Sequence, residues 1–176
     1  IELTGDELHL VMFHLGYVGE LIATELDIVV SSRFLLSAHP ADVPLMSPAY
    51  LRRGPAAYLA EGTDYLLWAL TDRLVDDYFP VFDKLADDID SLGEDVLRRP
   101  TSWTVERLFE VRRELLLVRH AVMPQREIFN QLTNRDLPMI KSDRIIFFRD
   151  VYDHLIRLSD ELDSHRELVG TTLDIY

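Results

Sequence analysis

The sequence contains no cysteine, and no apolar run approaches the roughly 18 to 20 residues that a membrane-spanning helix needs. Without cysteine, disulfide bonds, thiolate zinc sites and cysteine nucleophiles are all excluded. No signal peptide opens the chain. The 176 residues, of which 48% are hydrophobic, suffice for one domain with a packed core, or for a piece of a larger protein. We expect a polypeptide that is soluble as given.

Basic residues are scarce as well. The chain has 18 Lys and Arg against 31 Asp and Glu, which gives a net charge of −13. This balance argues against a nucleic-acid partner, because phosphates are bound by clustered Lys and Arg. It favours cationic partners, including divalent metal ions.

Catalytic motifs are also missing. The six histidines include no H-E-x-x-H pair, and neither a G-x-S-x-G elbow nor a G-x-x-x-x-G-K-[ST] loop occurs. A di-metal helix bundle would need two Glu-x-x-His repeats, and these are absent too. The sequence therefore predicts that the chain is not an enzyme.

The first sixty residues indicate a small antiparallel sheet. Short apolar or β-branched runs predict strands at 9–15, 21–30 and 33–39. Gly16 and Gly19 mark the first connection, and Ser31-Ser32 marks the second. Repeated prolines then predict a loop with one short helix over residues 40–60; they are Pro40, Pro44, Pro48 and Pro55.

From Thr63 onward, apolar residues recur every three or four positions, which is typical of helices. We expect a first long helix ending at Arg98-Arg99-Pro100, a second from Thr101 or Ser102 to about Asn134, and a third between Pro138 and Tyr176. Each is about 50 Å long at ~1.5 Å per residue.

The fold class predicted is α+β: a small antiparallel sheet, part of an α/β domain, followed by three long helices that form an elongated stalk. We place a partial N-terminal domain at 1–60 and the stalk at 61–176. Pro80 and Pro124 should kink their helices without ending them, because the apolar period resumes after each. The third pattern is still running at the last residue, so we expect the natural chain to continue.

Carboxylates are the main candidates for chemistry. Asp72 and Asp76 are four residues apart and share one helix face, where a hard cation would relieve their repulsion. A solvated acidic stripe would give the same pattern. Asp150 and His154 also share a face, and this spacing permits either a transition-metal site or a hydrogen bond between them.

Five segments in order resemble the CorA-type magnesium transporter family. Residues 64–80 (DYLLWALTDRLVDDYFP) resemble the start of its long cytosolic helix, and 97–100 (LRRP) resemble the bend after it. Residues 123–127 (MPQRE) resemble a Pro-x-Arg-Glu segment. Residues 147–154 (FFRDVYDH) give the most specific match, and 173–176 (LDIY) resemble the stretch before the pore helix enters the membrane.

The resemblance implies the cytosolic regulatory domain of a homopentameric membrane transporter, located on the cytoplasmic side of the cell membrane. The partners would be other copies of the chain and, through C-terminal helices missing here, the membrane. The cation would be Mg²⁺, with Co²⁺, Ni²⁺ or Zn²⁺ as alternatives.

Carried over residue by residue, the resemblance makes Asp150 the main metal ligand between subunits and Asp72 a second. Their acidic partners in the family lie upstream of the strands, in a segment that this chain lacks. Asp174 would lie on the pore-lining helix near its cytosolic mouth. Two other readings stay open: the same domain of a related zinc transporter, and a soluble acidic helical scaffold whose carboxylates only solvate the helices.

Overall fold

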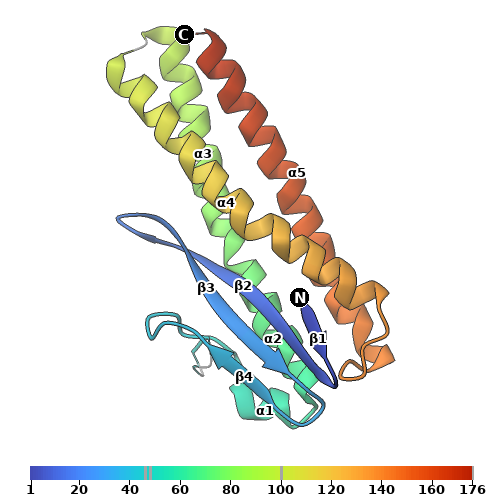
Figure 1. Cartoon of the computed structure of the whole chain (residues 1–176). Coiled ribbons are helices and arrows are strands. Elements are labelled where there is room, and N and C mark those ends of the chain that lie inside the picture. The colour runs from blue at the N-terminus through green and yellow to red at the C-terminus, as the bar shows by residue number, and fades with distance from the viewer. Residues whose placement is uncertain (46, 48, 100, 176) are drawn as a thin grey trace.

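The computed structural model of the chain describes residues 1–45, 47, 49–99 and 101–175. It is an elongated molecule in which a twisted sheet lies beside one half of a long helical stalk (Figure 1). The α+β class predicted from the sequence is confirmed. The expectations attached to Pro48, Pro100 and Tyr176 lie outside the described residues, and the division near residue 60 stays a prediction.

The sheet has four antiparallel strands in the order β1-β2-β3-β4, one more than predicted. They are β1 (Glu2–Thr4), β2 (Glu7–Val18), β3 (Glu20–Val30) and β4 (Leu35–Ala38). The missed strand, β1, has three residues, which is too short for any alternation to be recognised. Gly16 was predicted to lie in the first connection but belongs to β2, and Gly19 alone makes the turn, at φ 75°.

One face of the sheet is sealed against the helices. Apolar side chains on this face alternate with more exposed neighbours, as a half-buried strand requires. The fully buried ones are Leu8, Leu10 and Met12 of β2, with Leu26, Ile28 and Val30 of β3. They belong to the same hydrophobic core as the helices, so sheet and stalk are packed together.

Five α-helices and one 3₁₀ turn follow in the described part of the chain. They are α1 (Pro55–Leu59), α2 (Thr63–Asp76), α3 (Tyr78–Arg98), α4 (Ser102–Asn134), η1 (Ser142–Arg144) and α5 (Ile145–Ile175). Helix α4 begins with the predicted cap, because the Thr101 hydroxyl accepts a hydrogen bond from the Thr104 backbone N–H at 3.2 Å. It also runs through Pro124, as expected.

The first long helix, predicted as one, is divided into α2 and α3 at Asp77. The break lies one turn before Pro80. Proline has no N–H to offer the carbonyl of Asp76, and its ring collides with that carbonyl, so the helix is disturbed at Asp76, next to the break. Asp77 keeps helical angles, φ −68° and ψ −11°, and the chain continues in nearly the same direction.

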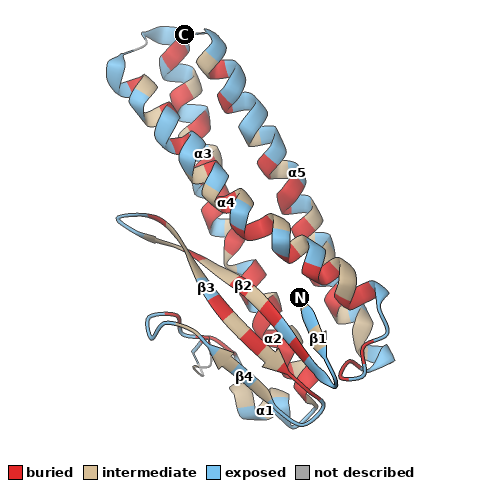
Figure 2. Ribbon diagram, viewed as in Figure 1, coloured by how far each residue is buried: buried red, intermediate tan, exposed pale blue. Residues whose placement is uncertain are grey.

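The stalk packs along the predicted apolar stripes (Figure 2). In α2 and α3 the residues that form the stripe recur every three or four positions, and all are buried: Leu67, Leu70, Leu74, Tyr78, Val81, Leu85, Ile89, Leu92 and Val96. Helices α3, α4 and α5 turn these stripes toward one another and leave their charged faces outside. No helix among the described residues is long and apolar enough to cross a membrane.

Two polar anchors fix α2 and α3 on the sheet and on α4. Thr63, in the first turn of α2, donates a hydrogen bond to the Ser31 carbonyl at 2.6 Å. At the start of α3, the buried Tyr78 hydroxyl donates to the Phe13 carbonyl of β2 and accepts from the Gln125 amide of α4. These bonds hold the α2–α3 break, and therefore the last turns of α2, in a fixed position.

Candidate metal centre

Two carboxylates and one imidazole meet where α2 packs against α5. Asp72 and Asp76 come from α2 and His154 comes from α5, and one ligand atom of each lies within 4.8 Å of the other two. His154 Nδ1 lies 4.0 Å from Asp76 Oδ1. That separation is too long for a hydrogen bond, so the imidazole and the carboxylate are close together but not bonded to each other.

The local sequence explains the assembly. In α2, the buried side chains of Leu67, Leu70 and Leu74 face the core, and the spacing of four residues puts both aspartates on a neighbouring face. In α5, Val151 and Leu155 are fully buried, and His154 lies at the edge of their stripe. Packing of the two apolar stripes therefore brings the imidazole over the carboxylates.

Asp72 is the electrostatically strained member. Its partial burial and the negative charge of Asp76 raise its pKa from 3.8 to about 6. The charge of Asp150 raises it further, while a charged His154 would lower it. Arg73 lines the same pocket as Asp72 but pairs with Asp77, at 3.1 Å, and no Lys or Arg among the described residues forms an ion pair with Asp72. A bound cation would therefore lower the pKa of the Asp72 carboxyl.

His154 presents an unused nitrogen. Its Nδ1 atom is shielded from solvent and has no hydrogen-bond partner among the described residues. The ring packs edge-on against Phe79, with 5.6 Å between ring centroids. Buried polar atoms are normally paired, so an orphaned nitrogen beside two carboxylates is chemically suited to a metal.

The donor set fits a divalent cation. Ligand atoms about 2.1 Å from a metal lie at most about 4.2 Å apart, so small side-chain rotations would close the group. Carboxylate oxygens suit Mg²⁺, which retains several waters, and the imidazole widens the choice to Co²⁺, Ni²⁺ and Zn²⁺. The same aspartates line a pocket of about 340 Å³, which leaves room for the waters; its other polar and aromatic lining residues are Tyr50, Arg52, Tyr58, Trp68 and Arg73.

The predicted site residues lie at three different places. Asp72 is in the centre, half-buried. Asp150 is exposed on α5, one turn before His154; its charge acts on Asp72, but it is not part of the three-residue group. The predicted alternative, an Asp150–His154 hydrogen bond, is not formed, because the nearest acid to Nδ1 belongs to α2.

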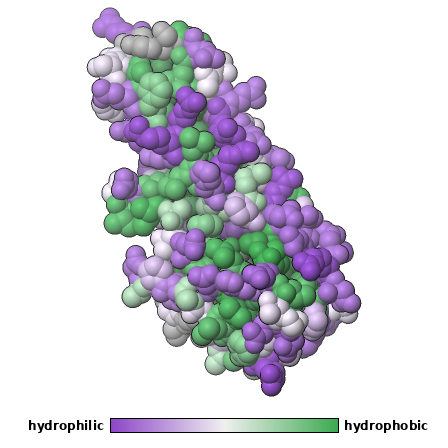
Figure 3. Space-filling view, viewed as in Figure 1, coloured by the Kyte–Doolittle hydropathy of each residue, from purple (hydrophilic) through white to green (hydrophobic). Residues whose placement is uncertain are grey.

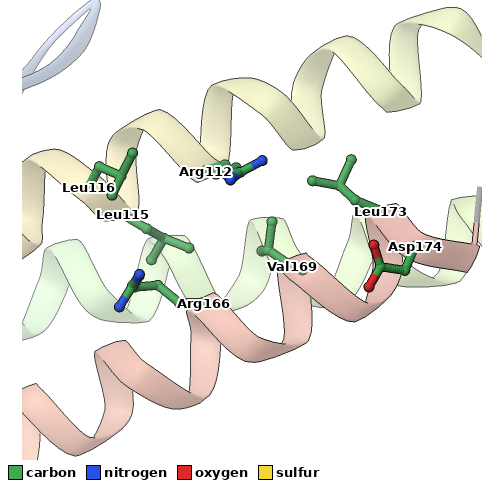
Figure 4. Close-up of a pocket in the computed structure, with 8 residues that line it drawn as sticks. Arg112, Leu115, Leu116, Arg166, Val169, Leu173 and Asp174 are labelled. Carbon is green, nitrogen blue, oxygen red and sulfur yellow. The ribbon is translucent and has the colours of Figure 1, made fainter.

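Asp174 lies far from this centre, twenty residues further along α5, or about 30 Å at ~1.5 Å per residue. It is exposed and borders a pocket of about 270 Å³ between α4 and α5. Figure 4 shows Arg112 on α4 and Arg166 on α5, with the side chains of Val169 and Leu173 pointing from α5 toward α4.

Sequence reasoning missed the pairing of Asp76 with His154. Both residues carried a signal, since each was recognised as one half of an i, i+4 pair on its own helix. The signal for their meeting is the register between α2 and α5, which are separated by about seventy residues. The spacing of residues within one helix does not predict how two helices align.

The family is established by sequence comparison. The chain belongs to the CorA-like Mg²⁺ transporter protein family, whose pattern matches residues 2–176. A curated relative, the cobalt/magnesium transport protein CorA of Thermotoga maritima, is 42% identical over 113 residues, which are 64% of this chain and 32% of that protein. The chain spans between a third and a half of the length of the curated relatives that it matches.

Solved structures share the fold. The soluble domain of CorA from Methanocaldococcus jannaschii matches with a TM-score of 0.85 and 18% identity, over 98% of this chain and 70% of that one. The ZntB cytoplasmic domain from Vibrio parahaemolyticus matches with a TM-score of 0.75 and 15% identity, over 98% of this chain and 69% of that one. At these identities the likeness establishes the architecture alone.

Proposed function

We propose that the chain is the cytosolic regulatory domain of a membrane transporter for Mg²⁺, assembled as a homopentamer, and that it has no enzymatic activity. The observation that carries the proposal is the cation-deficient group of Asp72, Asp76 and His154. Membership of the CorA-like family supports transport, and the names of its curated relatives support magnesium and cobalt as the cations.

Regulation would follow from the position of Asp150. Its carboxylate is exposed and adds negative charge near Asp72, so it is free to share a cation held by a neighbouring subunit. A shared cation holds two stalks together, and its loss leaves uncompensated charge that drives them apart. If each ion stabilises the closed state by about 1 kcal/mol, about ten ions per pentamer exceed the ~5.5 kcal/mol that shifts a two-state equilibrium from 1:99 to 99:1.

The test replaces Asp72→Asn together with Asp150→Asn in the full-length protein, reconstituted in vesicles. We expect the double variant to keep transporting when internal Mg²⁺ is raised to levels that shut the wild type. The matched control, Asp87→Asn with Asp90→Asn, removes the same charge from exposed positions of α3. Normal shut-off in the Asp72/Asp150 variant would contradict regulation through these two carboxylates.

A zinc transporter is the second candidate, favoured by the free Nδ1 of His154 and by the fold shared with the ZntB domain. Imidazole is a good ligand for Zn²⁺ and a poor one for Mg²⁺. Calorimetric titration of the chain with each ion separates the two: sub-micromolar Zn²⁺ binding that is lost in His154→Ala would support zinc. Millimolar Mg²⁺ binding that His154→Ala leaves intact would support magnesium.

A further inference from the structure

The end of the α3–α4 hairpin carries large apolar side chains in the open. Leu97 is 77% exposed and Trp103 is 61% exposed. They flank the connection between the two helices, together with the exposed Arg98 and Arg99. We call these four residues the hairpin tip.

Packing does not account for this exposure. The adjacent core positions are filled, since Val96 is 6% exposed and Thr104 is 2% exposed, so Leu97 and Trp103 lie outside a completed core. Single exposed apolar residues are ordinary in soluble proteins. Here, however, Ile175 at the end of α5 is also 63% exposed, and three of the five most exposed large hydrophobic side chains gather at one end of the stalk.

The hairpin tip lies beside the end of α5. Figure 1 shows the α3–α4 connection and the C-terminal end of the chain side by side, at the stalk end farthest from the sheet. The pocket that Arg112 shares with Leu173 agrees, because it brings the last turns of α5 against the early turns of α4. Figure 3 shows hydrophobic surface at this end, next to hydrophilic side chains.

The charge of the hairpin tip is opposite to that of the whole chain. Arg98 contacts Glu94 at 3.3 Å, but both side chains are mostly exposed, and such surface pairs contribute little. Arg99 makes no ion pair with any described residue. Two adjacent positive charges therefore stand next to an exposed Trp and Leu, on a protein of net charge −13.

We propose that the hairpin tip docks on an anionic lipid surface, with Trp103 and Leu97 in the interfacial layer and Arg98 and Arg99 against lipid phosphates. Trp is enriched at membrane interfaces because its ring is apolar with one polar edge. Basic side chains near an anionic leaflet each strengthen binding. The inference rests on the proposed function, which is what brings the end of α5 to a membrane.

The experiment uses the full-length protein reconstituted in vesicles of mixed phosphatidylglycerol and phosphatidylcholine. Residues 1–176 contain no cysteine, so after replacement of any cysteine elsewhere by serine, a nitroxide at Leu97→Cys reports on one site. We expect this label to be more accessible to oxygen, and less accessible to a water-soluble nickel chelate, than a control label at Asp87→Cys. The control is on the same helix, about 15 Å from the tip at ~1.5 Å per residue.

Equal, aqueous accessibility at the two sites would overturn the proposal. A label at Trp103→Cys gives a second reading if the Leu97 variant does not fold. Shielding from both reagents, with spectral broadening that disappears when labelled and unlabelled subunits are mixed, would show contact between copies and also overturn it. Arg98→Gln with Arg99→Gln should lower the docking equilibrium constant, the ratio of docked to undocked tips, by about 30-fold, since each basic residue contributes about fivefold.

The same sample separates this inference from the proposed function. Mg²⁺-dependent shut-off of transport is measured on the labelled protein. Normal shut-off with an aqueous Leu97 label rejects the docking of the hairpin tip alone. Loss of shut-off in the Asp72/Asp150 variant with a lipid-exposed label supports both.

Discussion

Two clusters of acidic side chains in this molecule differ in how their negative charge is neutralised. At the α3–α4 contact, Asp88, Glu110 and Glu114 surround Arg107, whose guanidinium lies 2.7 to 3.2 Å from the three carboxylates. At the α2–α5 contact, Asp72 and Asp76 lie beside His154, and no Lys or Arg among the described residues forms an ion pair with either aspartate. The first group contains its own cation and the second does not.

The pKa shifts record this difference. Partial burial alone would lower the pKa of Arg107, but hydrogen bonds to Glu110, Glu114 and Asp88 raise it, so the guanidinium stays charged. At the other site, burial and like charge raise the pKa of Asp72 to about 6. Acidic residues are therefore structural where a basic side chain neutralises them, and candidates for metal binding where none does.

The largest effect on stability is expected when Arg107, the cation of the first cluster, is removed. Arg107→Met should lower the free energy of unfolding by about 2 kcal/mol, because two partly buried carboxylates, Asp88 and Glu114, and the exposed Glu110 lose their counter-charge. Urea denaturation at pH 7 measures this. Since the variant converts the first group into one like the second, millimolar Mg²⁺ should restore part of the loss.

Arg119→Met is the matched control, because Arg119 has a single, mostly exposed partner, Asp163, at 3.0 Å. It should cost less than about 0.5 kcal/mol and show no Mg²⁺ effect. Equal losses in the two arginine variants would mean that the number of carboxylates around a cation does not matter here, and the comparison would fail.

The second expected effect concerns the imidazole. His154→Ala should weaken binding of Co²⁺ or Ni²⁺ by about tenfold, as loss of one nitrogen ligand does, while binding of Mg²⁺ changes little. Calorimetric titration of the chain gives both constants. His120→Ala is the control, since it removes a histidine from α4, outside the metal group. An equal loss of Mg²⁺ affinity would show that His154 acts by holding the aspartates rather than as a ligand.

The helical part of the fold was predictable because its signal is local and repeated. Each apolar position from Leu67 to Val96 adds to one period, so a single error does not change the result. The break at Asp77 was not predictable at its position, since the proline that causes it lies three residues later. Strand β1 was missed for the opposite reason, because Glu2–Thr4 pairs with β2 without any pattern of its own.

The candidate site was predictable only in part. Asp72 was recognised from its spacing and from the resemblance of its segment, and Asp150 from the segment FFRDVYDH. The link between Asp76 and His154 depends on how α5 lies along α2, and that register is set by packing around Phe148, Val151 and Leu155. Such long-range geometry is not contained in any one helix.

The smallest expected effect tests Asp72 itself, and its sign depends on pH. In the unfolded chain Asp72 ionises near 3.8 and in the folded chain near 6, so the folded state binds more protons between these values. The contribution of Asp72 to stability is therefore fully present below about pH 4 and is lost as the pH rises through 6. At pH 7 the ionised Asp72 therefore destabilises the folded state, and Asp72→Asn removes this effect. The variant should raise the free energy of unfolding at pH 7 by about 1 kcal/mol, which is the value from the pKa difference reduced because the side chain is partly exposed.

Urea denaturation between pH 4 and pH 8, without divalent cations, measures the effect. The curves of wild type and Asp72→Asn should approach each other as the pH falls toward 4, because Asp72 of the folded wild type is then protonated and neutral like the asparagine. Asp87→Asn, exposed on α3, should show no such pH-dependent gap. Adding Mg²⁺ at pH 7 should then close the gap by stabilising the wild type alone, because only an ionised Asp72 binds the cation. A variant that is less stable than wild type at pH 7 without metal would mean that a protein cation already neutralises Asp72, and the contrast with Arg107 would disappear.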